Sequence, residues 1–145
     1  MKKFLTITGI IVAALILGII LLGGKSQVEK VEKAIEDGDS FVLVISSLDC
    51  PACKNYKDFT LTYYEEDPII PLYVLEIEDA FKNDANRLYE FLIRYELIDS
   101  PEDNFSTPTT FIVKNGTFKS IGENDKKGKE GPIPLGELKD LINNA

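Results

Sequence analysis

The stretch FVLVISSLDCPAC, residues 41–53, places an apolar run directly before the only two cysteines of the chain. Residues 41–45 are all apolar, mostly branched and bordered by polar residues, which is typical of a strand buried on both faces. A helical pattern follows from Pro51 to about Glu66, with apolar positions at Ala52, Tyr56, Phe59 and Tyr63. A proline suits the first turn of a helix. The sequence therefore predicts a cysteine pair at the junction of a strand and a helix.

That position favours thiol chemistry at Cys50 and Cys53. Backbone N–H groups and the dipole at a helix N-terminus stabilise a thiolate and lower the pKa of a thiol. The spacing of three residues lets Cys53 reach the Cys50 sulfur and close a disulfide. A four-residue ring constrains the unfolded chain little, so the spacing favours a redox-active pair over a structural bridge. With no third cysteine and no histidine, we expect no metal site and no cofactor beyond the Cys50–Cys53 disulfide.

The first 25 residues have a different composition from the rest. Residues 4–22 are uncharged and apolar, and Lys2 and Lys3 precede them. This length suffices for a transmembrane helix, and the lysines favour a cytoplasmic N-terminus. A cleaved signal peptide is the alternative, but its apolar segment is usually shorter. We expect residues 1–25 to be a single-pass anchor in the cell membrane, with the rest of the chain extracytoplasmic.

The charge of the remaining chain is strongly acidic. Of the 16 basic residues three lie in residues 1–25, so residues 26–145 carry 13 basic and 24 acidic side chains, a net charge of −11. This balance makes nucleic acid an unsuitable partner and is typical of a solvated surface.

The rest of the chain alternates helices and strands. Ser26 to Glu29 forms a capping box that begins a helix ending at residues 37–39. We expect a strand over 72–77, a helix over 79–97, a hairpin over 109–121 turning at Asn115-Gly116, a loop over 122–134 and a closing helix from Leu135. This order, α-β-α-β-α-β-β-α, predicts an α/β fold with a mixed sheet covered on both faces.

Three motifs in this order resemble the thioredoxin-like family over residues 26–145. They are the cysteine pair with Lys54, the segment 107–116 (TPTTFIVKNG) and the ending 135–142 (LGELKDLI). The resemblance implies a thioredoxin-like three-layer α/β/α sandwich, with Cys50 as the attacking thiol and Cys53 as the resolving thiol. It also implies that the Thr107–Pro108 bond is cis and lies beside the pair, where the Thr107 backbone binds a substrate peptide as an added strand. An ordinary proline at the start of a strand is the alternative.

With its anchor, the chain is similar to membrane-tethered thioredoxin-like proteins of Gram-positive bacteria, including bacteriocin transport accessory proteins. This narrower resemblance implies exported cysteine-containing proteins or peptides as partners, and a membrane redox partner. The leading hypothesis is a membrane-tethered thiol-disulfide oxidoreductase. The alternative is a non-enzymatic binding or accessory module of the same fold with a structural disulfide.

Several residues depart from the family pattern around the cysteines. Asp49 replaces the usual tryptophan, and Pro51-Ala52 replaces Gly-Pro. Val44 and Val74 stand where the family has the aspartate and lysine that handle the proton of the resolving thiol. Glu76 or water is a possible substitute, but we expect Glu76 to face outward from its strand.

The charges beside the pair bear on the direction of exchange. Asp49 raises the pKa of Cys50, and Lys54 and Lys57 lower it, so we expect a mildly perturbed thiol. With no histidine beside the pair, we expect a reducing or intermediate potential.

Overall fold

In the computed structural model, residues 26–98 and 105–145 are described, with the side chains of 81–85 left aside. The described residues contain one mixed sheet of five strands: β1 (Phe41–Ser46), β2 (Leu72–Glu76), β3 (Thr109–Lys114), β4 (Thr117–Phe118) and β5 (Gly128–Glu130). The strands run in the order β2-β1-β3-β4, and β5 pairs with β3. Only the β1–β2 pair is parallel, and its register sets Ser46 opposite Glu76.

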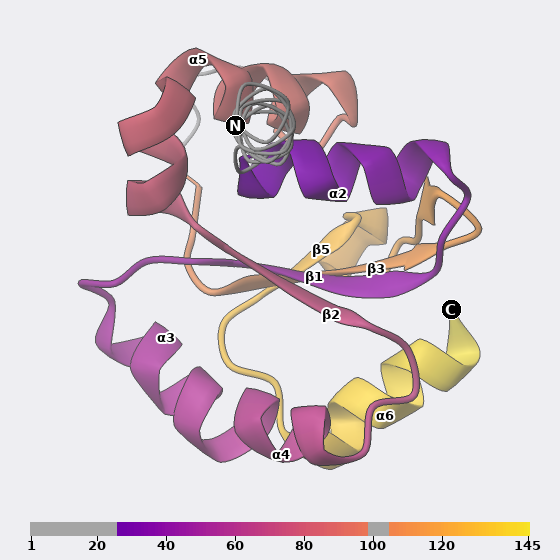
Figure 1. Cartoon of the computed structure of the whole chain (residues 1–145). Helices are drawn as coiled ribbons and strands as arrows, with labels where there is room; N and C mark the ends of the chain where they lie inside the picture. The colour runs from indigo at the N-terminus through magenta and orange to yellow at the C-terminus, as the bar shows by residue number, and fades with distance from the viewer. Residues whose placement is uncertain (1–25, 99–104) are drawn as a thin grey trace, which may run out of the picture.

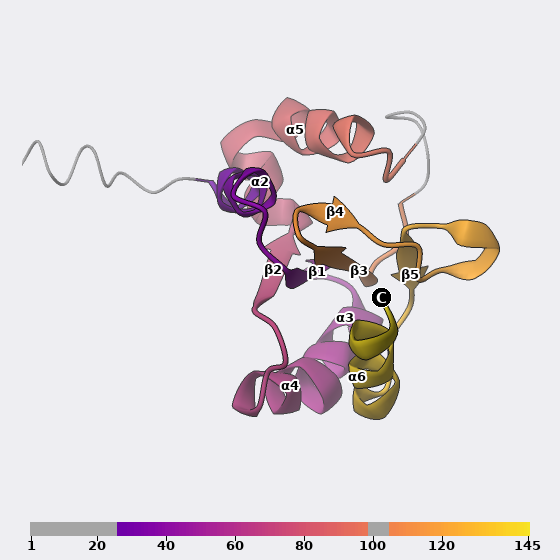
Figure 2. The same ribbon diagram turned by 90° about the vertical axis from the view of Figure 1, so that its right-hand side faces the viewer.

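Helices cover both faces of the sheet (Figures 1 and 2). One layer holds α2 (Gln27–Glu36) and α5 (Ile77–Arg94). The other holds α3 (Pro51–Tyr56), a π-helical turn (Lys57–Leu61), α4 (Thr62–Glu66) and α6 (Leu135–Asn144). Alternate residues of β1 enter two separate cores, Phe41, Leu43 and Ile45 on the α2/α5 side and Val42 and Val44 on the α3/α6 side. The predicted three-layer α/β/α sandwich with a mixed sheet is confirmed.

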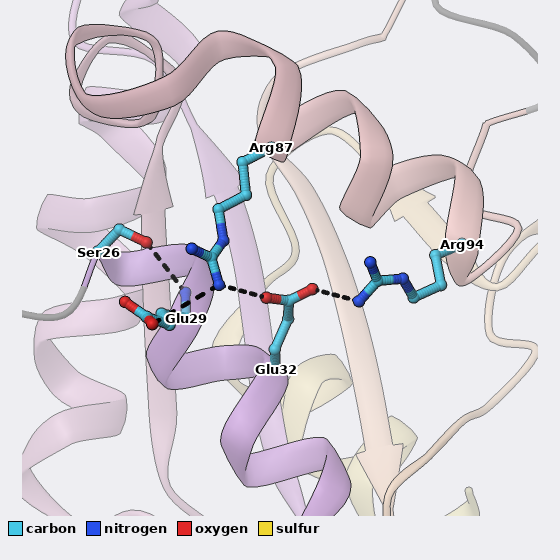
Figure 3. A network of polar contacts seen from close by, with 5 residues as sticks. All are labelled: Ser26, Glu29, Glu32, Arg87 and Arg94. Carbon is cyan, nitrogen blue, oxygen red and sulfur yellow. Dashed lines mark hydrogen bonds and ion pairs between the residues drawn. The ribbon is translucent and has the colours of Figure 1, made fainter.

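A charged cluster joins the two helices of the first layer (Figure 3). Ser26 caps α2 by accepting a hydrogen bond from the backbone N–H of Glu29 at 3.2 Å, as the sequence predicts. One turn later Glu32, only 8% exposed, accepts hydrogen bonds from Arg94 at 2.8 Å and Arg87 at 3.1 Å. Both arginines come from α5, so this buried carboxylate ties α2 to α5.

The helix after the cysteines has a different buried face from the predicted one. The helical run from Pro51 to Glu66 is continuous, but the π-turn inserts one residue into the 3.6-residue repeat. The buried positions beyond Tyr56 are therefore Thr60, Leu61 and Tyr64. The predicted apolar stripe was wrong beyond Tyr56, because Phe59 is 73% exposed and Tyr63 is 52% exposed.

Some predicted boundaries also differ. Ile77 begins α5 instead of ending β2, α5 ends at Arg94, and β4 is shorter than expected. The expected loop 122–134 contains β5 and a 3₁₀ turn (Glu123–Asp125). The β5 sequence Gly-Lys-Glu carries no apolar signal, because this strand lies at the edge of the sheet. Gly128 suits it, since a Cβ there would lie 2.6 Å from the Phe111 ring.

The predicted anchor, residues 1–25, lies outside the described residues. In residues 26–98 and 105–145 no helix combines the length and the apolar character that crossing a membrane requires.

Candidate active site

The cysteine pair lies where β1 leads into α3. Cys50 is the N-cap of α3, and its sulfur accepts a hydrogen bond from the backbone N–H of Cys53 at 3.1 Å. Cys50 is partly exposed, whereas Cys53, one helical turn later, is buried with 4% exposure. Both are free thiols in this structure. The predicted junction of strand and helix is confirmed, and it makes one thiol accessible and hides the other.

The segment before β3 completes the site. The Thr107–Pro108 peptide bond is cis, as the resemblance implies. The Cys50 thiol donates a hydrogen bond to the Thr107 carbonyl oxygen at 3.4 Å, across 57 positions of sequence. The structure thus brings the four predicted residues Cys50, Cys53, Thr107 and Pro108 together.

The two thiols have opposite pKa shifts. Burial raises the pKa of Cys50, but hydrogen bonds from the Cys53 side chain and backbone, the Thr107 side chain and the Ala52 backbone outweigh it, so that pKa lies below its ordinary value. Burial raises the pKa of Cys53, the hydrogen bond with Cys50 raises it further, and weaker hydrogen bonds from Ser47, Thr107 and Ser46 oppose the rise. The expected balance of charges from Asp49, Lys54 and Lys57 is therefore not the main influence on Cys50; burial and hydrogen bonding are.

The surface around Cys50 is open to a partner molecule. Asp49 and Pro51 are exposed and Ala52 is half-buried, so the residues that flank and separate the cysteines reach the surface. Because Cys50 is also partly exposed, another molecule has access to its sulfur from this side.

A carboxylate that the sequence reasoning missed holds the loop before Cys50. Glu78, in the first turn of α5, accepts hydrogen bonds from the Ser47 hydroxyl at 2.5 Å and the Leu48 backbone N–H at 3.0 Å. These two bonds lower the pKa of Glu78. The available signal was topological: parallel strands β1 and β2 end side by side, so residues just after each strand meet at one edge.

Apolar residues lie where the resemblance to thioredoxin-like proteins places a proton-handling pair. Val44 is fully buried, and Val74 lies opposite it in the β1–β2 register, on the side of the sheet that α3 covers. The nearby buried hydroxyls of Tyr56 and Thr110 bond each other at 2.9 Å, and burial raises the pKa of Tyr56 to about 12. Such a phenol stays protonated at neutral pH and cannot accept a proton from Cys53.

The expectation that Glu76 faces outward is wrong. Its side chain follows Val74 on the side of the sheet that α3 covers, and its Oε2 atom is buried. As for metals, no cluster of three or more potential ligands occurs among residues 26–98 and 105–145.

Comparisons with solved structures identify the fold. A candidate oxidoreductase with a thioredoxin fold is similar to this chain at a TM-score of 0.54 and 15% identity, over 81% of this chain and 89% of its own. Oxidised thioredoxin from Plasmodium falciparum is similar at a TM-score of 0.50 and 16% identity, over 79% and 88%. At these identities the likeness shows the fold alone, and the chain has a thioredoxin-like fold that carries a cysteine pair. Neither a family model nor a curated protein matches the sequence.

Proposed function

We propose that this chain is a thiol-disulfide oxidoreductase that exchanges disulfides through Cys50 and Cys53. The observation that carries the proposal is the asymmetry of the two thiols. Cys50 is accessible and accepts a hydrogen bond from the Cys53 N–H, and its pKa is lowered, whereas Cys53 is buried and its pKa is raised. Exchange requires this division, because the exposed thiolate attacks and the hidden thiol waits to resolve the intermediate.

The reaction proceeds in two balanced steps. The Cys50 thiolate attacks a substrate disulfide, forming a mixed disulfide and releasing one substrate sulfur as a thiolate that takes up a proton. Cys53 then loses its proton and attacks the Cys50 sulfur, which forms the Cys50–Cys53 disulfide and releases the second substrate thiolate. The protein dithiol is oxidised and the substrate disulfide is reduced; the reverse sequence oxidises a substrate dithiol.

The cis Thr107–Pro108 segment is the proposed site for the substrate backbone. Thr107 is half-buried and its carbonyl oxygen lies 3.4 Å from the Cys50 sulfur, so a peptide paired with this backbone would present its own sulfur to Cys50. Backbone pairing is independent of side chains, which suits an enzyme with several substrates.

Tethering and location are also part of the proposal. The apolar, uncharged run at residues 4–22 supports a single-pass membrane anchor with the described domain outside the cytoplasm. Exported cysteine-containing proteins or peptides are then the substrates, with a membrane redox partner to reset the pair. Cys50 has hydrogen bonds but no histidine beside it, so we place its potential between those of thioredoxin and protein disulfide isomerase, about −270 to −180 mV.

A redox titration of the full chain in glutathione buffers tests this proposal. We expect reversible oxidation in that range, loss of exchange in Cys50→Ser, and accumulation of mixed disulfides in Cys53→Ser. A disulfide that stays closed below about −300 mV would instead identify a structural bridge. The valines at positions 44 and 74 favour that alternative accessory module. If so, a double Cys50→Ser/Cys53→Ser variant would keep its biological activity.

A further inference from the structure

One buried acidic group remains without a partner near the cysteine pair. Among the side chains that the structure describes, the one buried nitrogen or oxygen without a hydrogen-bond partner is Oε2 of Glu76. Leaving a carboxylate oxygen buried and unpaired is costly, and such a group in a native structure calls for an explanation. Glu76 is the last residue of β2, at the edge of the sheet where β1 leads to Cys50.

The sheet register orients this carboxylate toward α3. In β2, Leu72 and Val74 pack in the core that α3 and α6 cover, while Tyr73 and Leu75 pack in the opposite core. Glu76 continues the first series, because successive residues of a strand alternate between faces. The parallel register sets Glu76 opposite Ser46. The Ser46 side chain also acts on Cys53, whose pKa it lowers. Glu76 and Cys53 therefore flank the same serine.

The proposed reaction requires a proton acceptor at this place. Cys53 is 4% exposed, and burial raises its pKa, so it is a protonated thiol until the resolving step. The apolar side chains of Val44 and Val74 accept no proton. Tyr56 holds its own proton up to about pH 12. Glu78 already accepts hydrogen bonds from Ser47 and Leu48.

We infer that Glu76 is the general base that takes the proton of Cys53 when the mixed disulfide is resolved, directly or through the Ser46 hydroxyl. This inference rests on the proposed function. The Cys53 S–H proton moves to a Glu76 carboxylate oxygen, the Cys53 thiolate forms its bond to the Cys50 sulfur, and the bond from Cys50 to the substrate sulfur breaks. The departing substrate thiolate then takes the proton from the Glu76 carboxylic acid.

Two uncharged side chains border Glu76 at the end of β2. Ser46 of β1 and Gln27 of α2, which accepts the Glu76 backbone N–H at 3.4 Å, carry no charge. Two titratable groups lie at the same edge of the sheet: Cys53 of α3, on which Ser46 acts, and Glu78 of α5, which Ser47 and Leu48 hold by hydrogen bonds. Of these, only Cys53 gives up a proton during resolution.

The test follows the two steps of exchange separately in the full chain. Reduced protein reacts with the aryl disulfide dithiobis(nitrobenzoate): attack by Cys50 releases a first coloured thiolate, and resolution by Cys53 releases a second. For Glu76→Gln we expect an unchanged first phase and a second phase slowed about 100-fold at neutral pH. The two proteins should converge at alkaline pH, where Cys53 ionises without a base. Glu76→Asp, which keeps the carboxylate, should recover part of the rate, and Glu66→Gln, on the exposed end of α4, should behave as wild type.

The experiment distinguishes a failure of the proposed exchange chemistry from a failure of the proposed role of Glu76. If the wild-type chain releases only one thiolate, the proposed exchange chemistry is wrong. If it releases two and the second is equally fast in Glu76→Gln at every pH, the exchange stands and the role of Glu76 is refuted. A second phase slowed equally at neutral and alkaline pH would show a merely structural role. If Glu76→Gln folds poorly, Glu76→Asp carries the test: its second phase should be slower than that of wild type at neutral pH and converge with it at alkaline pH, and a second phase as fast as that of wild type at every pH would refute the role of Glu76.

Discussion

Replacing Glu32 by glutamine should loosen the attachment of α2 to α5 by a predictable amount. The glutamate accepts two charge-assisted hydrogen bonds, and its side chain is 11% exposed (Figure 3). Losing a partner of a fully buried ion pair costs about 3–5 kcal/mol, because a charge stays buried and unpaired. Here Arg87 and Arg94 are 37% and 57% exposed and regain water, so we expect Glu32→Gln to lower the free energy of unfolding by about 2 kcal/mol.

Urea unfolding of the reduced full chain measures this change. The midpoint should fall with an unchanged slope, because the surface exposed on unfolding stays the same. Glu29→Gln is the matched control on the same helix: its carboxylate is 40% exposed and lies 3.7 Å from Arg87, so its loss should stay below about 0.5 kcal/mol. Equal losses in the two variants would refute the reasoning. A Glu32→Leu variant more stable than wild type would show that desolvation of the carboxylate outweighs its ion pairs.

Three further predictions concern the site. Alkylation by iodoacetamide should reach half its maximal rate at Cys50 below the usual thiol pKa of about 9. Because the pKa of Cys50 is lower in the folded chain than in the unfolded chain, ionisation of Cys50 stabilises the reduced protein above about pH 9. This stabilisation is lost as the pH falls through the pKa of the folded chain. Comparing the free energy of unfolding of wild type and Cys50→Ser across this pH range measures the effect. Tyr56→Phe should cost about 1–2 kcal/mol in urea unfolding by leaving the Thr110 hydroxyl unpaired, and Thr110→Val in addition should restore part of the loss. Glu78→Ala should release the loop at Ser47 and slow the attack of Cys50 severalfold in single-turnover kinetics, with little loss of stability. An unchanged rate would show that the loop keeps its conformation without Glu78.

Patterns that depend on neighbouring residues allowed most of the fold to be predicted. The continuous apolar run of β1, the Asn115-Gly116 turn and the cap at Ser26 are each set by local chemistry. The cysteine pair was placed correctly for the same reason, because a strand followed by Pro51 fixes where the helix begins.

The features that the sequence missed depend on tertiary contacts. β5 pairs with β3, and its Gly128 lets the strand lie against the Phe111 ring; the polar sequence of β5 reveals neither contact. The π-turn shifts the buried face after Tyr56, and one inserted residue leaves no mark in the apolar pattern. Glu76 and Glu78 look like ordinary surface charges until the parallel register brings the end of β2 beside the end of β1.

The contact between Gln27 and Glu76 bears on how far the Cys50 sulfur can move from the chain that precedes α2. Gln27 begins α2, and its side chain accepts the backbone N–H of the residue that ends β2, so the domain is joined to the preceding chain at the same rim that holds Cys50. If the proposed anchor holds the domain at this rim, its reactive sulfur would sweep through only a small volume around the point of attachment. Disulfides carried close to that point would meet it at high effective concentration, and freely diffusing proteins would meet it rarely. Proximity to the attachment point would then select substrates before any side chain does.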